Sequence, residues 1–199
     1  MKKIFLILAT LSLSSCLISA SDNSQISANK PQHFPFLIGA DLNGVKYNLP
    51  NQFSGKFNLI AIGFEREHQS AIDTWIPALT EVINTYPDLN IKFYEIPLIY
   101  ELSTFSRAWV NNGMRFGIRD QEARKRTITV FTNRDKFYEI MKMQGDRIYI
   151  VLLSDEGKIL WRTDGEMTSE KLILLKRILG SFKNVNPEIK KDLKENSIN

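Results

Sequence analysis

Apolar runs and polar interruptions divide this chain into alternating strands and helices. Phe57–Phe64 is almost continuously apolar, as expected for a strand that is covered on both faces. Apolar residues then recur at helical period, which predicts a helix with one buried stripe. Pro77 lies inside this helix and should kink it, because proline removes a backbone donor. The stripe consists of Ala71, Ile72, Trp75, Ile76, Leu79, Val82 and Ile83.

The rest of the chain continues this alternation. Turn residues within Leu37–Pro50 predict a β-hairpin. Further helices are expected over Ser103–Asn111, ended by Gly113, and from an Asn133 or Asp135 cap to about Met143, with Phe137, Ile140 and Met141 inward. A last helix starts at Thr168-Ser169-Glu170. Further strands are expected at Asn90–Leu98, Thr127–Phe131, Arg147–Leu153 and Lys158–Arg162. This order predicts an α/β sandwich around a central mixed sheet, preceded by the hairpin.

The N-terminus has the pattern of a secretory signal. Lys2 and Lys3 precede an apolar run, Ile4–Leu13, that is too short to span a bilayer. Leu13-Ser14-Ser15-Cys16 resembles a bacterial lipobox, in which lipid is attached to the cysteine and the chain is cut before it. Ordinary cleavage after Ala20 is the alternative, although Ile18 suits that cut poorly. We therefore expect a protein of the bacterial cell envelope that faces the periplasm and is lipid-anchored to the inner or outer membrane through Cys16.

Composition suggests the boundaries of the domain. Residues 1–15 form the expected signal peptide, and the polar residues that follow, up to 35, are expected to be a tether. The folded domain is expected over residues 36–182, which is an ordinary size for one domain. Residues 183–199 are polar and are expected to be a helix extension or a frayed tail.

Residues 57–79, FNLIAIGFEREHQSAIDTWIPAL, resemble the first strand and active-site helix of the thioredoxin-like redoxins, the superfamily of thiol-disulfide reductases and peroxidases. In this resemblance Phe64 and Pro77 match the strand-end Phe and the helix Pro of the family. His68 takes the place of the Trp in the WCxxC box, and Gln69 and Ile72 take the places of its two cysteines. Neither side chain can form the thiolate that performs thiol-disulfide exchange.

A second stretch, YIVLLSDEGKILWRTDGEMTSEKL, is similar to the C-terminal half of the redoxins, so the resemblance covers about Asp41 to Leu179. The reductases carry a cis-proline just before this stretch, where Gly145-Asp146-Arg147-Ile148 stands here. The phrase LLSDEGKILWRTDG also distantly resembles the redoxin-type mitochondrial ATP-synthase assembly factor. The resemblance therefore implies a redox-inactive thioredoxin-like domain that serves in binding, scaffolding or assembly of an envelope protein, and not as an enzyme.

Polar residues stand where the family keeps its chemistry. Glu65, Arg66, Glu67 and His68 lie at a helix N-terminus, which offers free N–H groups and a partial positive charge. This ledge could bind a partner or small ligand, or act in acid–base catalysis through His68 with Glu65 or Glu67. We favour simple capping of the helix. A cleft kept at His68 would favour an enzyme or ligand binder, whereas a filled cleft with an apolar patch elsewhere would favour partner binding.

Charge and the remaining candidate residues narrow the function classes. The only other histidine is His33, and no ligand spacing recurs, so no metal or other cofactor is expected. The net charge of +4 becomes +2 when Lys2 and Lys3 leave with the signal, and no nucleic-acid binding is expected. A basic set could face anionic lipid headgroups or an acidic partner, although Asp120 and Glu122 among it favour a solvated helix. That set is Arg115, Arg119, Arg124, Lys125 and Arg126. Six aromatic residues could form an aromatic surface, although most of them are expected to be buried or half-buried because they fall within periodic segments. They are Trp75, Trp109, Trp161, Tyr94, Tyr100 and Tyr149.

Overall fold

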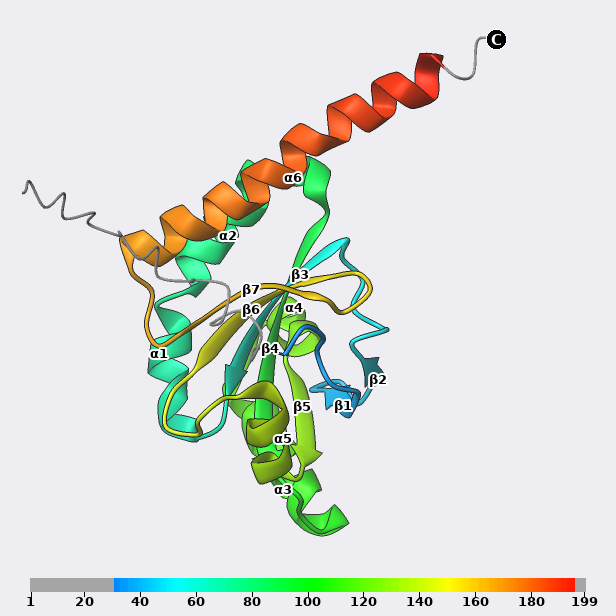
Figure 1. Cartoon of the computed structure of the whole chain (residues 1–199). Helices are drawn as coiled ribbons and strands as arrows, with labels where there is room; N and C mark the ends of the chain where they lie inside the picture. Colours follow the sequence, from blue (N-terminus) through cyan, green and yellow to red (C-terminus); the bar gives the residue numbers. More distant parts are fainter. Residues whose placement is uncertain (1–30, 196–199) are drawn as a thin grey trace, which may run out of the picture. The chain divides into compact units, whose positions relative to one another are not determined.

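A seven-stranded mixed sheet organises the computed structural model, which describes residues 31–195 and their side chains through Lys183 (Figure 1). The strand order is β2-β1-β5-β4-β3-β6-β7. β3 pairs parallel with β4, and β4 with β5, while the other pairs are antiparallel. The strands are β1 Leu37–Asp41, β2 Lys46–Leu49, β3 Phe57–Gly63, β4 Ile91–Tyr100, β5 Ile128–Thr132, β6 Tyr149–Ser154 and β7 Ile159–Asp164. The predicted α/β fold with a central mixed sheet and an N-terminal hairpin is confirmed.

The helix that follows β3 is divided in two. All seven residues of β3 are buried, so the strand forms the centre of the sheet. The chain then makes the short 3-10 helix η1 (Arg66–His68), α1 (Gln69–Asp73) and α2 (Ile76–Thr85). Pro77 lies in the first turn of α2, where its missing N–H removes no intrahelical bond. The predicted kink is thus a break between two helices.

The remaining helices differ from the predictions in their ends and in the residues that they bury. They are η2 Pro87–Leu89, α3 Thr104–Gly117, α4 Gln121–Arg126, α5 Arg134–Met141 and α6 Ser169–Glu195. Gly113 does not end α3, because its backbone stays helical and the helix continues to Gly117. α5 is capped by Asn133 and ends at Lys142, which has a left-handed backbone (φ 50°). Ile140 is exposed, since Arg134, Phe137 and Met141 share the inward face of α5. Trp109 and Tyr100 are also exposed instead of lying in the core.

Two apolar layers cover the two faces of the sheet. On one face, side chains of α1, α2 and α6 pack on β3, β6 and β7, and Trp75 meets Trp161 edge to face with ring centres 6.4 Å apart. On the other face, Phe137 and Met141 of α5 pack with the hairpin residue Leu49. Figure 1 shows α6 alongside α2, and α3 beyond the ends of β4 and β5. The helix that bears Gln69 is therefore anchored on one face while α5 approaches from the other.

The ends of the folded part differ from the predicted boundaries. His33 and Phe34 were both expected in the tether. Instead, Phe34 is buried in the core, and His33 forms a β-bridge with Lys158 of the β6–β7 turn. At the other end α6 continues past Phe182 to Glu195, which is the helix extension that was one of the two expectations for this tail. Cys16 and the expected signal peptide lie outside the described residues. Within residues 31–195, no helix has both the length and the apolar character that crossing a bilayer requires.

Candidate functional site

The ledge sits where the central strand meets its helix. β3 ends at Gly63, and a Cβ added there would lie 3.1 Å from Cδ1 of Ile72, so strand and helix are in close contact. Phe64 remains buried, and Glu65 is extended before η1 begins. The structure therefore places Gln69 on the helix directly after β3, as predicted. The ledge therefore lies at the junction between β3 and the helix that follows it.

The two positions that match the cysteines of the redoxins have opposite surroundings. Gln69 is exposed, and its Nε2 donates a hydrogen bond to Oδ1 of Asp73 (2.9 Å). Ile72 is buried and packs in the same apolar cluster as Trp75. Cys16 is the only cysteine among the 199 residues. The chain consequently cannot supply the pair of thiols that a dithiol exchange reaction uses.

His68 is tied to the backbone of its own ledge. Its Nδ1 accepts a hydrogen bond from the backbone N–H of Phe64 (3.1 Å), and its ring stands edge-on to the Phe64 ring. A neutral imidazole with Nδ1 as acceptor carries its proton on Nε2. His68 therefore closes the turn between strand and helix, and its basic nitrogen is already occupied.

A buried arginine that the sequence did not point to lies beside the ledge. The Arg134 side chain is only 6% exposed, and its Nη2 lies 2.8 Å from Oε1 of Glu65. Its Nε donates to the hydroxyl oxygen of Tyr138 (2.7 Å), and its guanidinium carbon lies 4.3 Å from the ring centre of Tyr100. Such cation–π contacts gain strength when they are shielded from water. Glu65 is thus joined to α5 by its ion pair with Arg134.

The pKa values of this cluster reflect its burial and its pairing. Burial opposes the charge of Arg134, but its hydrogen bonds to Glu65 and Tyr138 outweigh that effect and raise the pKa of the guanidinium. Burial also raises the pKa of the Tyr138 hydroxyl, against a lowering effect of the neighbouring Arg134. Both groups therefore keep their ordinary protonation states at neutral pH, with Arg134 charged and Tyr138 neutral. The cluster is a structural one in which each polar group has a partner.

The four ledge residues do not converge on one point. Glu65 joins Arg134, and His68 joins the backbone of Phe64. Arg66 and Glu67 are exposed and make no ion pair within the described part of the chain. Among the residues described, no group of three or more His, Cys, Asp or Glu side chains could hold a metal ion. The arrangement offers polar contacts but no assembled nucleophile and base.

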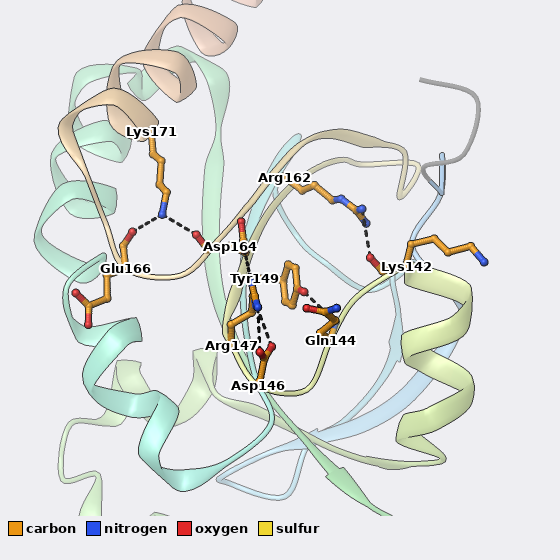
Figure 2. A network of polar contacts seen from close by, with 9 residues as sticks. All are labelled: Lys142, Gln144, Asp146, Arg147, Tyr149, Arg162, Asp164, Glu166 and Lys171. Carbon is orange, nitrogen blue, oxygen red and sulfur yellow. Dashed lines mark hydrogen bonds and ion pairs between the residues drawn. The ribbon is translucent and has the colours of Figure 1, made fainter. Parts of the chain in front are cut away.

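The loop before β6 is fixed by charge where the reductases carry a cis-proline (Figure 2). Arg147 bridges the carboxylates of Asp146 (2.8 Å) and Asp164 of β7 (3.1 Å). Lys171 of α6 donates to the backbone oxygens of Asp164 and Glu166 (2.6 and 2.7 Å). The Arg147 hydrogen bond lowers the pKa of Asp146. A network of ion pairs thus replaces the backbone feature that contacts substrate in the reductases.

Sequence reasoning missed Arg134 and Tyr138. Both lie about seventy positions away from Glu65 along the chain, and Arg134 follows directly after a helix cap, where an arginine usually faces solvent. The available signal was the spacing of Arg134, Phe137 and Met141, which places the arginine on the apolar face of α5.

Comparison with known proteins supports the fold. No family model matches the chain, and no curated protein matches it. Among solved structures, a putative electron transfer protein from Aquifex aeolicus VF5 is similar at 14% identity and a TM-score of 0.50, over 75% of this chain and 97% of that one. The thioredoxin domain of a thiol-disulfide oxidoreductase from Bacteroides vulgatus is similar at 20% identity (TM-score 0.44; 77% and 96% covered). BsSco, a member of the Sco family of cytochrome c oxidase assembly proteins, is similar at 9% identity (TM-score 0.48; 76% and 93% covered).

At these identities the likeness concerns the fold and not the activity. The likeness to the Aquifex aeolicus protein extends over 75% of this chain and 97% of that one. The resemblance to the redoxin superfamily is therefore confirmed at the level of the fold: this chain is an α/β protein with a thioredoxin-like fold.

Proposed function

We propose that this protein is exported, lipid-anchored and redox-inactive, and that it binds an envelope protein and assists its assembly. The observation that carries the proposal is that Gln69 and Ile72 occupy the two cysteine positions of a thioredoxin-like ledge. Thiol-disulfide exchange requires a thiolate at the attacking position. A thioredoxin-like fold without this thiolate supports a role in binding and not in exchange.

The contacts of the ledge support binding over catalysis. A general base needs a free acceptor within reach of the proton that it removes. Nδ1 of His68 already accepts from Phe64, and Glu65 is paired with Arg134. Large exposed apolar side chains lie elsewhere, on α3 and around the N-terminal hairpin, where Phe36 and Ile38 are both exposed. A ledge whose histidine and glutamate already have partners, together with apolar surface elsewhere, favours a binding protein over an enzyme.

The redox part of the proposal is tested with insulin as substrate. The mature protein is expected not to reduce insulin disulfides and not to consume peroxide, because its ledge has no thiol. A dithiol thioredoxin assayed in parallel is the positive control. Reduction above the rate without protein would overturn the proposal.

The anchor is tested on the mature protein from its native membrane. Leu13-Ser14-Ser15-Cys16 motivates lipid attachment at Cys16. Mass spectrometry is expected to find Cys16 as the acylated first residue, and a high-salt wash is expected to release the Cys16→Ser variant from the membrane but not the unchanged protein. Stable anchoring needs more than one acyl chain. An unmodified N-terminus at Ser21 would contradict the anchor and leave the redox result standing.

The partner is tested by affinity purification from native membranes. We expect an envelope protein to be recovered in stoichiometric amount, and to fail to assemble in cells that lack this chain. The Cys16→Ser variant shows whether recovery depends on the membrane location. Normal assembly of every recovered protein in those cells would contradict the assembly role.

A further inference from the structure

α3 presents its apolar residues to solvent. Phe105, Trp109 and Phe116 are 84%, 75% and 89% exposed, and no residue of α3 is buried. They follow one another at spacings of four and seven, so they lie on one side of the helix. We call this side the aromatic face of α3. Beside it, an open hollow of about 460 Å³ is lined in part by Leu102 and Val110, which extend the apolar surface.

The opposite side of α3 faces the domain. Arg107 is two positions from Phe105 and from Trp109, which places it across the helix from both. Its Nε donates to the backbone oxygen of Leu102 (2.7 Å), and its guanidinium carbon lies 5.2 Å from the ring centre of Phe131 in β5. The aromatic face of α3 therefore points away from the domain, and the domain itself does not cover it.

The net charge around the aromatic face of α3 is positive, because residues 101–126 carry six basic and three acidic side chains. α3 contains Arg107 and Arg115 and no acidic residue, and Arg119 follows its C-terminal end. The side chains of Arg115 and Arg119 are exposed and make no ion pair in the part of the chain that the structure describes. By contrast, Lys125 is paired with Glu122. An occupant of this surface should accordingly be apolar where it meets the rings and anionic around them.

We propose that the aromatic face of α3 rests on the surface of a membrane that contains anionic lipid. Helices that lie in the membrane interface combine Trp and Phe on one side with Arg or Lys on the other, as α3 does. Indole and phenyl rings settle at the level of the headgroups, and each nearby basic residue adds attraction to an anionic leaflet. Arg115 and Arg119 supply that attraction, and the three rings supply the apolar contact.

Charge argues against the other occupants within this chain. A second copy would bring Arg115 and Arg119 against the same basic surface. Residues 16–30 carry one acid, Asp22, and one base, Lys30, so that segment does not complement the basic surface either. If Cys16 is acylated as proposed above, the residues from Cys16 to Pro31 extend to at most about 50 Å, which keeps the domain close to one bilayer. The contact would orient the domain on that bilayer.

The experiment measures sedimentation of the chain from Pro31 onward with lipid vesicles. This part contains both apolar clusters and every described strand, and it lacks Cys16, so its result does not depend on the lipid anchor. Vesicles of phosphatidylglycerol and phosphatidylcholine in equal parts are expected to bind it, with an affinity that falls as salt is added. Phosphatidylcholine vesicles are expected to bind it much more weakly.

Variants locate the contact. Trp109→Gln is expected to weaken partition about tenfold, and Phe105→Gln with Phe116→Gln to weaken it further. Arg115→Gln with Arg119→Gln should weaken partition about tenfold or more and reduce its salt dependence. Ile173→Gln and Lys46→Gln are the matched controls, because both residues are exposed on other elements, and both variants should bind like the unchanged protein.

A second measurement uses the unchanged sequence. Lipids with brominated acyl chains should quench Trp109 and not Trp75 or Trp161, which are buried. Unquenched Trp109, or equal partition of the aromatic variants and the unchanged protein, would overturn the proposal. If the aromatic variants bind vesicles normally but lose an acidic protein partner, the face docks that protein and the membrane assignment is likewise overturned.

Discussion

Gln69 and Ile72 stand one helical turn apart, yet one faces water and the other faces the core. The exposed position lies at the first residue of α1, and the buried one packs beneath it. A CxxC box needs such an arrangement, with an accessible first thiol and a sheltered second one. The local backbone is therefore compatible with a CxxC box at these two positions.

Restoring both cysteines tests this geometry. We expect Gln69→Cys with Ile72→Cys to form an internal disulfide under oxidising conditions. The two positions are three residues apart in the first turn of α1, which brings their side chains close together. Thiol titration before and after reduction measures it, with each single variant as control. Ile72→Cys alone should lower the free energy of unfolding by about 1 kcal/mol, because it removes buried apolar atoms. A double variant that keeps two free thiols would show that the alignment to the redoxins is wrong.

The ion pairs of the loop before β6 predict a pH effect on stability. Folding lowers the pKa of Asp146, mainly through Arg147. Such a group contributes stability above its ordinary pKa of about 3.9 and loses that contribution as the pH falls through its lower folded value. We expect Asp146→Asn to lower the urea midpoint at neutral pH, and the difference in midpoint from the unchanged protein to shrink as the pH falls below the ordinary pKa of an aspartate.

The matched control is Asp88→Asn, because Asp88 is also exposed and has no ion pair among the residues described. The urea midpoint of this variant should differ from that of the unchanged protein by the same small amount at neutral and at acid pH. A midpoint gap for Asp146→Asn that is the same at every pH would mean that the substitution acts by something other than the carboxylate charge.

At the scale of elements, α3 has little tertiary support. None of its residues is buried, so its stability depends on local terms: the Ser103 cap, backbone propensity and the contacts of Arg107. Gly113 lies inside it with a helical backbone, and nothing lies within 4 Å of the place where a Cβ would be. The glycine thus weakens the helix without serving a close contact.

We therefore expect Gly113→Ala to stabilise α3 by about 0.5–1 kcal/mol. Amide hydrogen exchange should slow up to about fivefold within α3 and stay unchanged in β3. Gly157→Ala is the opposite case, because Gly157 has φ +77° and its Cβ would come within 2.4 Å of Pro50. That variant should lower the free energy of unfolding of the whole domain. Equal effects of the two substitutions would contradict the description of α3 as locally stabilised.

At the scale of the whole molecule, Trp75 connects distant parts of the chain. It is fully buried between α1 and α2, meets Trp161 of β7, and donates from Nε1 to the backbone oxygen of Gly165 (2.9 Å). One side chain thus joins the ledge helix to the strand and loop that carry Asp164. Its loss should affect folding and not only the local site.

Trp75→Phe is expected to lower the free energy of unfolding by about 1–3 kcal/mol, because it leaves a cavity and an unpaired carbonyl oxygen. Trp109→Phe, at an exposed position, should stay within about 0.5 kcal/mol of the unchanged protein. Urea unfolding followed by circular dichroism measures both. If the two variants unfolded at the same urea concentration, Trp75 would not be the core residue described here.

The sequence by itself determined the order of the elements and the loss of the thiol pair. Local pattern is sufficient for these features, because a buried strand such as β3 is apolar throughout and a helix repeats its apolar residues at a fixed spacing. The cysteine positions followed from a gapless match over one strand and one helix. The sequence therefore placed His68, Gln69 and Ile72 at the start of the helix that follows the first buried strand.

Only the tertiary structure decided which surfaces the elements bury. Arg134 reaches Glu65 because α5 lies against the same end of the sheet, a contact that no local spacing indicates. Likewise, the spacing of Phe105, Trp109 and Phe116 fits a core helix equally well, and only the packing of Arg107 on Phe131 turns the rings outward. Periodicity specifies that residues share a face, whereas contacts between distant segments decide whether that face meets the core, a neighbour or solvent.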